Sequence, residues 1–202
     1  MHAAKINIQL NRCMRVISGC IKATPIQWLP VLTNIMPPSI RRQQALVSTI
    51  DKSLSFDNSI LANLMREVPN QSLSRKPPFI TYQELKANNF NPLDKWKMEW
   101  SASVPDNGFL ILDPTQKLDG FNLPRRQWVT LNRIRTGRGR CGQTLHKWGL
   151  AADASCDCGA PVQTIDHIVS SCYLRKFDGS LDDINKCTPE AVQWMEDLNI
   201  VL

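Results

Sequence analysis

The sequence predicts a mainly α-helical protein with a helical N-terminal part, an irregular proline-rich linker and a small zinc-stabilised C-terminal module. Three observations lead to this prediction. Apolar residues recur at helical spacing along residues 1–68 and again after Pro124. Six prolines fall between residues 69 and 114, where they interrupt regular structure. Three cysteines and one histidine lie within a stretch of 17 residues near the C-terminus, with metal-ligand spacing.

The N-terminal part is expected to contain four helices. The first spans residues 3–22, where Ile6, Met14 and Ile21 mark an apolar stripe. Thr24 as N-cap and the proline after it predict the start of a short second helix. A third helix is expected from residue 37 to about 52, and a fourth from about 59 to 68. Their apolar stripes are expected to form the core.

The linker, residues 69–122, is expected to be irregular apart from one helix. That helix lies near residues 92–102, where Trp96 and Trp100 fall one turn apart. The run GFLILD at residues 108–113 is compatible with one short strand.

A strongly basic segment follows the linker. A helix is expected to begin after Pro124 and to end at Thr136-Gly137, with a short helix over residues 143–150. Residues 122–150 contain seven basic and no acidic residues, whereas residues 151–202 have a net charge of −6. An acid-free block favours phosphate binding over the alternative of a solvated face, which normally mixes signs. The candidate nucleic-acid contacts are Arg125, Arg126, Arg133, Arg135, Arg138, Arg140 and Lys147.

The cysteine and histidine cluster predicts a structural zinc site. The stretch CDCGAPVQTIDHIVSSC places Cys156, Cys158, His167 and Cys172 as four ligands, a closed set without an open position. The alternative is three buried thiols and a surface histidine. His167 and Cys172 are separated by about 500° of α-helix, so the helix must end or distort for both to reach one ion.

The remaining cysteines have other expected places. Cys13 and Cys20 share one helical face and are expected in the core, while Cys141 and Cys187 stand alone. His146 is a less favoured substitute for one of the zinc ligands. Three thiolates with one Zn²⁺ ion sum to a charge of −1, so the zinc is expected to fold its segment rather than to bind phosphate.

Several classes of function are disfavoured. No stretch is long and apolar enough for a membrane span, and polar residues interrupt any signal-peptide core, which favours a nuclear or cytoplasmic location. No phosphate loop, dinucleotide fingerprint or serine nucleophile motif is present, so no small-molecule substrate is expected. Asp182-Asp183 is the only pair of adjacent aspartates, and it fits the first turn of a helix better than a catalytic metal site.

The order of these pieces resembles the C-terminal region of reverse transcriptases from jockey-like non-LTR retrotransposons. The matching stretches cover nearly the whole chain. They are INIQLNRCMRVISGCIKATPIQWLPVLTNIMPPSIRRQQA, SRKPPF, DPTQKLDGFNLPRRQWVTLNRIRTGRGRCGQTLHKWGL, the zinc stretch, FDGSLDDI and VQWMEDLNIVL.

The resemblance implies a division of the chain and a role for it. Residues 1–68 look like the thumb end of the polymerase, 69–122 a linker, 123–175 the basic helix with a CCHC zinc knuckle, and 176–202 an acidic helical tail. The family's palm, with its catalytic aspartates, and its endonuclease have no counterpart in the sequence. We therefore expect a non-catalytic piece that binds template RNA or target DNA. The alternative is a module that packs on the rest of the polymerase without binding nucleic acid.

Overall fold

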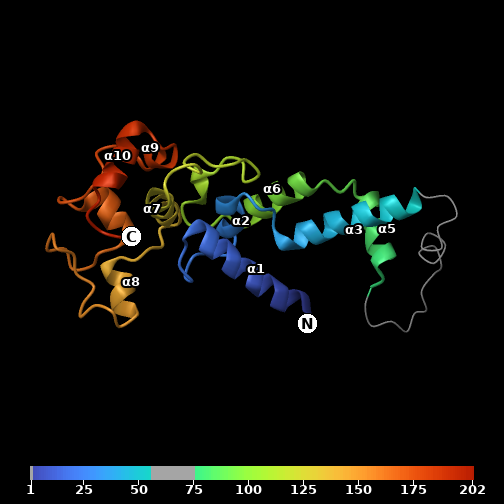
Figure 1. The fold of residues 1–202 in the computed structure, drawn as a ribbon, viewed down its shortest axis with the longest axis horizontal. Helices are drawn as coiled ribbons and strands as arrows, with labels where there is room; N and C mark the ends of the chain where they lie inside the picture. Colours follow the sequence, from blue (N-terminus) through green and yellow to red (C-terminus); the bar gives the residue numbers. More distant parts are fainter. Residues whose placement is uncertain (1, 56–75) are drawn as a thin grey trace. The chain divides into compact units, whose positions relative to one another are not determined.

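The computed structural model describes residues 2–55 and 76–202, which are mainly helical and contain no strand (Figure 1). The predicted mainly α fold is confirmed for these residues. The chain groups into two compact units: unit 1 comprises Met1–Ile35 and Ala102–Leu202, and unit 2 comprises Met36–Ser101. No helix within the described ranges is long and apolar enough to cross a membrane.

Unit 1 begins with α1 (His2–Ser18) and α2 (Trp28–Thr33). The predicted extension of the first helix to residue 22 is wrong, because Gly19 adopts a φ of +72°, a left-handed conformation that ends α-helices. A Cβ atom at Gly19 would lie 2.2 Å from Cγ2 of Val129 in α7 (Arg125–Thr136). Glycine is therefore needed both for the turn and for the close approach of α7.

The apolar stripe of α1 is buried only in part. Met14 is 3% exposed and Ile21, just beyond the helix, is 8% exposed, but Ile6 is 55% and Ile17 43% exposed. The expectation that this stripe belongs to the core is therefore wrong at Ile6 and at Ile17. Thr24 does not cap α2, which begins at Trp28 after a turn.

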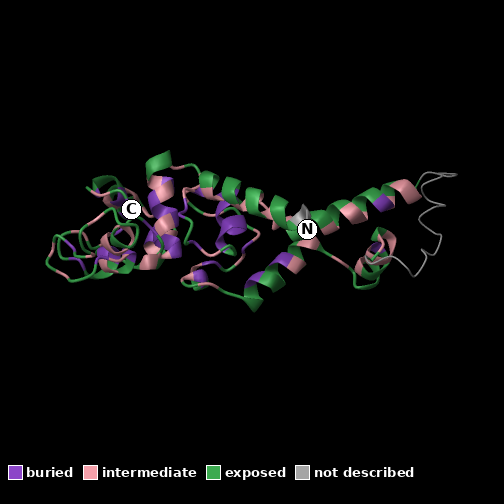
Figure 2. Cartoon of the chain, turned by 90° about the horizontal axis from the view of Figure 1, so that it is seen from below, coloured by how far each residue is buried: buried purple, intermediate pink, exposed green. Residues whose placement is uncertain are grey.

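The centre of unit 1 is α7, whose sequence-based bounds are confirmed. It begins directly after Pro124 and ends at Gly137, which has a φ of +60° and donates its N–H to the carbonyls of Arg133 and Ile134. Around α7 pack α1, the 3-10 helix η1 (Gly108–Leu110), α9 (Leu181–Asn185) and α10 (Pro189–Asp197). Buried residues are purple in Figure 2. One core cluster comprises Trp128, Leu131, Ile134, Cys141, Ile165, Ile168, Val169, Ile184, Ala191, Met195, Leu198 and Leu202.

Unit 2 contains α3 (Pro38–Leu54), α5 (Pro78–Ala87) and most of α6 (Pro92–Ala102). The tyrosine hydroxyl of Tyr82 donates to Asp51 at 2.7 Å and ties α5 to α3. The predicted helices near 37–52 and 92–102 are confirmed by α3 and α6. The predicted helix from about 59 to 68 lies outside the described residues.

Two expectations for the proline-rich segment are wrong. α5 replaces irregular structure, because the proline at its first position fixes a helical φ and has no N–H to leave unpaired. The predicted short strand at residues 108–113 is instead η1, and Leu112 beyond it is 98% exposed. A strand needs a neighbouring strand for its hydrogen bonds, and the described residues supply none.

Candidate metal centre and basic surface

The first two candidate ligands come from a tight turn. The N–H of Gly159 donates to the carbonyl of Cys156 at 2.8 Å, and the N–H of Cys156 donates to the carbonyl of Ala160 at 2.9 Å. Gly159 has a φ of +87°, while a Cβ atom there would meet nothing within 4 Å. Glycine is thus required for backbone conformation alone, and the turn holds Cys156 and Cys158 on one side of the loop.

The other two candidate ligands come from a distorted helix. His167–Ser171 forms the π-helix η2, and the N–H of Cys172 reaches back five residues to the carbonyl of His167 at 2.8 Å. Ile168 and Val169 are buried and fix η2 to the core of unit 1. The predicted distortion between His167 and Cys172 is therefore confirmed, and it takes the form of a wider helical turn.

The turn and η2 bring the four predicted ligand atoms together. All four lie within 4.8 Å of one another. Sγ of Cys156 lies 3.8 Å from Sγ of Cys172, and Sγ of Cys158 lies 3.2 Å from Nε2 of His167. Two sulfurs bound to the same tetrahedral zinc ion lie roughly 3.8 Å apart. The cluster could therefore hold a metal ion, and its geometry and donor atoms are consistent with zinc.

Two polar side chains surround the sulfur of Cys156. Nε2 of Gln163 donates to it at 3.3 Å, and Nη1 of Arg175 lies 3.9 Å away. Burial alone would raise the pKa of Cys156, but hydrogen bonds from the Cys158 backbone and Gln163 lower that pKa to about 6. This environment favours the thiolate, the form that binds metals.

Arg175 links the cluster to the end of the chain. Its guanidinium forms an ion pair with Asp157 and donates through Nε to Asn199 at 3.0 Å. Its carbonyl accepts the indole N–H of Trp194 in α10 at 2.8 Å. A positive charge at this position offsets the net negative charge that three thiolates and a zinc ion would carry.

The other cysteines and His146 lie apart from this cluster. Cys20 is buried, as expected, but Cys13 is exposed and the expectation that it belongs to the core is wrong. Its neighbour Met14 takes the buried face of α1 instead. His146 is exposed and its Nδ1 lies 3.3 Å from the carbonyl of Ala151, away from the four-residue group.

Three of the predicted nucleic-acid contacts bond to backbone carbonyls within unit 1. Arg125 donates to the carbonyls of Val16 and Ile17 at the C-terminal end of α1. Arg126 donates to the carbonyl of Leu198 at 2.7 Å, and Arg133 to that of Gly19 at 2.9 Å. These hydrogen bonds join α7 to the C-terminal end of α1 and to the segment just after α10. Arg125 and Arg126 nevertheless remain exposed.

Arg135 is different, because it is 1% exposed. Its guanidinium donates to the carbonyl of Asp119 at 2.9 Å and to the side chain of Asn185 at 2.7 Å. Cζ of the guanidinium also lies 5.9 Å from the ring centre of Trp128. Burial lowers the pKa of Arg135 to about 10. The structure thus places this residue in the interior, out of reach of a ligand on the surface.

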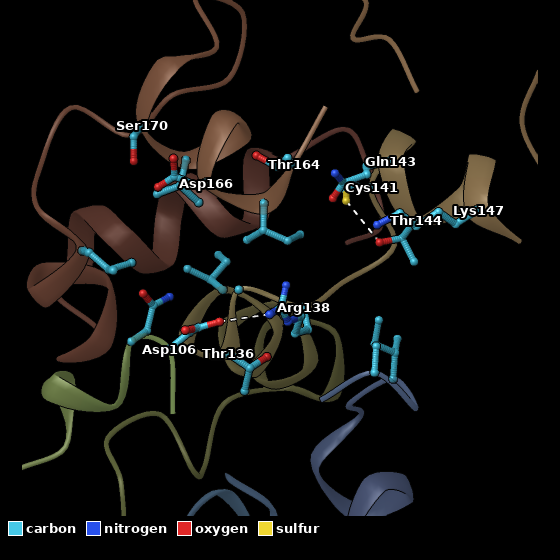
Figure 3. A pocket seen from close by; sticks show the side chains of 18 of the residues that line it. Asp106, Thr136, Arg138, Cys141, Gln143, Thr144, Lys147, Thr164, Asp166 and Ser170 are labelled. Carbon is cyan, nitrogen blue, oxygen red and sulfur yellow. Dashed lines mark hydrogen bonds and ion pairs between the residues drawn. The ribbon is translucent and has the colours of Figure 1, made fainter. Parts of the chain in front are cut away.

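Two of the last three predicted contacts line a cleft of about 530 Å³ (Figure 3). Arg138, Arg140 and Lys147 are exposed, and Arg138 and Lys147 line the cleft. Arg138 pairs with Asp106 at 3.0 Å, whereas Arg140 and Lys147 form no ion pair within the described part of the chain. Figure 3 shows Asp166 and Ser170 across the cleft from Arg138, so the wall next to η2 is partly acidic.

The chain is similar to part of one known retroelement protein. It is 30% identical over 95 residues to the "Retrovirus-related Pol polyprotein from type-1 retrotransposable element R1" of Bradysia coprophila. The chain therefore contains a retrotransposon-related region. The aligned stretch is 47% of the chain but only 9% of that polyprotein. No protein-family profile matches the chain, and no solved structure matches it.

Three residues that sequence reasoning missed belong to this region. Gln163 and Arg175 contact the sulfur of Cys156, and Trp148, 46% exposed, lines the cleft beside Lys147. The sequence provided a weak indication of Arg175, since it is the only arginine in the acidic segment after residue 150. It provided no indication of Gln163, because no spacing pattern marks a single glutamine as a neighbour of metal ligands.

Proposed function

We propose that the chain is a non-catalytic C-terminal piece of a retrotransposon reverse transcriptase, of the jockey-like kind, that binds nucleic acid beside a structural zinc site. The observation that supports it most is the position of the cluster. η2 carries the candidate ligand His167, and its N-cap residue Asp166 and its Ser170 line the same cleft as Arg138 and Lys147. A closed cysteine and histidine set favours a folding role for zinc, and exposed cations favour phosphate binding.

The proposed contact surface is smaller than the set of basic residues in the sequence. It consists of Arg138, Arg140 and Lys147, with Trp148 available for stacking on an unpaired base. Arg125, Arg126 and Arg133 contribute positive charge while bonding to carbonyls, and Arg135 is left out because it is buried. Single-stranded RNA is the proposed ligand, with DNA as the second arm of the test.

The zinc proposal is tested by metal content. Native mass spectrometry is expected to find one zinc ion per chain, and Cys172→Ser is expected to lose it. The matched control is Cys141→Ala, which removes another buried thiol that lies outside the four-residue group. Retention of zinc by Cys172→Ser, or its loss from Cys141→Ala, would show that the ligands are assigned wrongly.

The nucleic-acid proposal is tested by titration with a single-stranded RNA and a DNA of the same sequence at several salt concentrations. Affinity is expected to fall with salt, and the slope of log affinity against log salt concentration is expected to decrease in magnitude by about 0.7 for each phosphate-contacting cation removed. The variants are Arg138→Ala, Arg140→Ala and Lys147→Ala. Lys176→Ala and Lys186→Ala, exposed lysines of the acidic segment, serve as controls. Binding that is absent at low salt, or equal in all variants, contradicts the proposal.

The absence of catalysis is part of the proposal. Asp183 accepts hydrogen bonds from Ser180 in a capping box, and Asp182 forms an ion pair with Lys186 at 2.6 Å. Both carboxylates therefore already have partners at the ends of α9. We expect no primer extension by this chain. Extension that disappears in Asp182→Asn would overturn this expectation.

A second candidate function is docking onto the rest of a polymerase. The observation that favours it is the exposed apolar surface of α1, where Ile6, Ile8 and Val16 are 55%, 53% and 73% exposed. If α1 docks onto the polymerase, replacing these three residues by serine is expected to reduce co-purification with an upstream polymerase segment and to leave the affinity for RNA unchanged.

A further inference from the structure

Gln163 joins the candidate metal cluster to α8 (Gly142–Lys147), and it is 9% exposed. Its Nε2 donates to Sγ of Cys156 at 3.3 Å, while its Oε1 accepts the N–H of Gly142 at 2.8 Å. Its carbonyl accepts the N–H of Gln143 at 3.0 Å, and its own N–H donates to the carbonyl of Ala154 at 2.7 Å. One residue thus bonds to a ligand sulfur and to the first two residues of a helix.

α8 depends on outside partners for its stability. It has six residues, and its N-cap residue Cys141 provides no side-chain cap. Helices this short are marginal in water, and their first N–H groups have no partner inside the helix. Gln163 supplies acceptors for two of these groups, at Gly142 and Gln143.

The packing at Gly142 strengthens the connection. A Cβ atom there would lie 2.9 Å from the carbonyl oxygens of both Ala154 and Ser155, and 3.1 Å from Cβ of Gln163. The start of α8 is therefore in tight contact with the segment that leads into Cys156. Lys147 is at the other end of α8, next to Trp148, and both line the cleft.

We propose that Gln163 is a positioning residue that couples metal binding at the cluster to the ordering of α8. A metal that fixes the sulfur of Cys156 also fixes the amide of Gln163, and through it the first turn of α8. Hydrogen bonds to ligand atoms of this kind orient metal sites, and here the same side chain orients a helix. The effect on nucleic-acid affinity rests on the proposed function, whereas the coupling to α8 does not.

The test compares wild type with Gln163→Met, which keeps the length of the side chain and removes both of its hydrogen bonds. Co²⁺ is the probe metal, and amide hydrogen exchange of Gly142 and Gln143 is the readout. In wild type, Co²⁺ is expected to slow this exchange by about tenfold or more. In Gln163→Met, Co²⁺ is expected to bind with an affinity about 10- to 100-fold weaker. Its thiolate-to-cobalt absorption shifts, and bound metal no longer protects Gly142.

Gln193→Met is the matched control, because Gln193 lies on α10 and, among the described residues, its side chain bonds to Asp197 alone. It is expected to behave as wild type in every measurement. Protection of Gly142 by Co²⁺ that persists in Gln163→Met overturns the proposal. If Gln163→Met does not fold, the wild-type measurement is sufficient. Equal amide exchange at Gly142 of wild type with and without Co²⁺ would also overturn the proposal.

RNA affinity provides a separate arm. Removal of the metal is expected to weaken binding of a single-stranded RNA to wild type by about tenfold, as for typical couplings between sites. In metal-saturated Gln163→Met the affinity is expected to match that of metal-free wild type. RNA that never binds refutes the proposed function, while the exchange measurement still decides whether Gln163 couples the cluster to α8.

Discussion

At the scale of single residues, burial separates arginines that stabilise the fold from arginines that can meet a ligand. Arg135 and Arg140 both belong to the acid-free basic segment, yet Arg135 is 1% exposed and Arg140 is exposed. A buried guanidinium needs all of its partners, because unpaired buried charge is costly. Its hydrogen bonds reach Asp119 and Asn185, which come from two other segments of unit 1.

We predict that Arg135→Met destabilises the protein by about 2–4 kcal/mol, because it leaves the partly buried acceptors on Asp119 and Asn185 without their donor. Arg140→Met, at an exposed site, is expected to change stability by less than about 0.5 kcal/mol. Urea unfolding followed by circular dichroism measures both. Similar losses in the two variants would show that the buried network contributes little.

A second residue-scale prediction concerns two glycines with nearly the same backbone conformation. Gly19 has a φ of +72° and Gly149 a φ of +70°, but only Gly19 faces a close neighbour, Val129. Gly149→Ala is expected to cost about 1 kcal/mol from backbone strain alone. Gly19→Ala adds a clash with α7, for a total of about 3 kcal/mol. Thermal unfolding of both variants provides the comparison, and equal losses would argue against close packing of α1 on α7.

At the scale of elements, short helices in unit 1 depend on capping interactions at their ends. α9 has five residues and carries a capping box in which Ser180 and Asp183 bond to each other's backbone N–H groups. Hydrogen bonds from the Ser180 side chain and backbone hold the pKa of Asp183 below its ordinary value. The ionised carboxylate is therefore the form that stabilises α9.

The pH dependence of this cap follows from the lowered pKa. The unfolded carboxyl titrates near pH 4. The stabilisation is thus complete above that pH and is lost as the pH falls through the lower folded pKa. Ser180→Ala is expected to lower the unfolding temperature by a few degrees at pH 7. The difference from wild type should shrink below about pH 4. A difference that is independent of pH would contradict the assigned role of Asp183.

At the scale of the whole molecule, segments that the sequence suggests are separate meet in unit 1. α7, from the basic segment, packs against α1 near the N-terminus and against α9 and α10 near the C-terminus. Leu202 is fully buried in the same core cluster as Leu131. The basic helix and the acidic tail therefore share one core, and they are expected to unfold together.

This shared core predicts a large effect from the last residue of the chain. Leu202→Ala is expected to cost about 2–5 kcal/mol, since it leaves a cavity beside α7. Val201→Ala, at a residue that is 66% exposed, is expected to cost less than about 0.5 kcal/mol. Hydrogen exchange of the α7 amides and of the α1 amides should report the same transition. Separate transitions for the two probes would show that unit 1 is not cooperative.

The sequence by itself determined the helical class, the bounds of α7, the four candidate ligand residues and the need for a distorted helix between His167 and Cys172. These features depend on local spacing and on residues at helix ends, which one segment contains in full. Only the tertiary structure decided which arginines are buried and which side chains surround the sulfur of Cys156. Those roles depend on partners far away in the chain, as in the bond from Arg133 to Gly19, 114 residues apart. No periodicity in a sequence encodes such a pair, because it forms only once packing brings distant segments together.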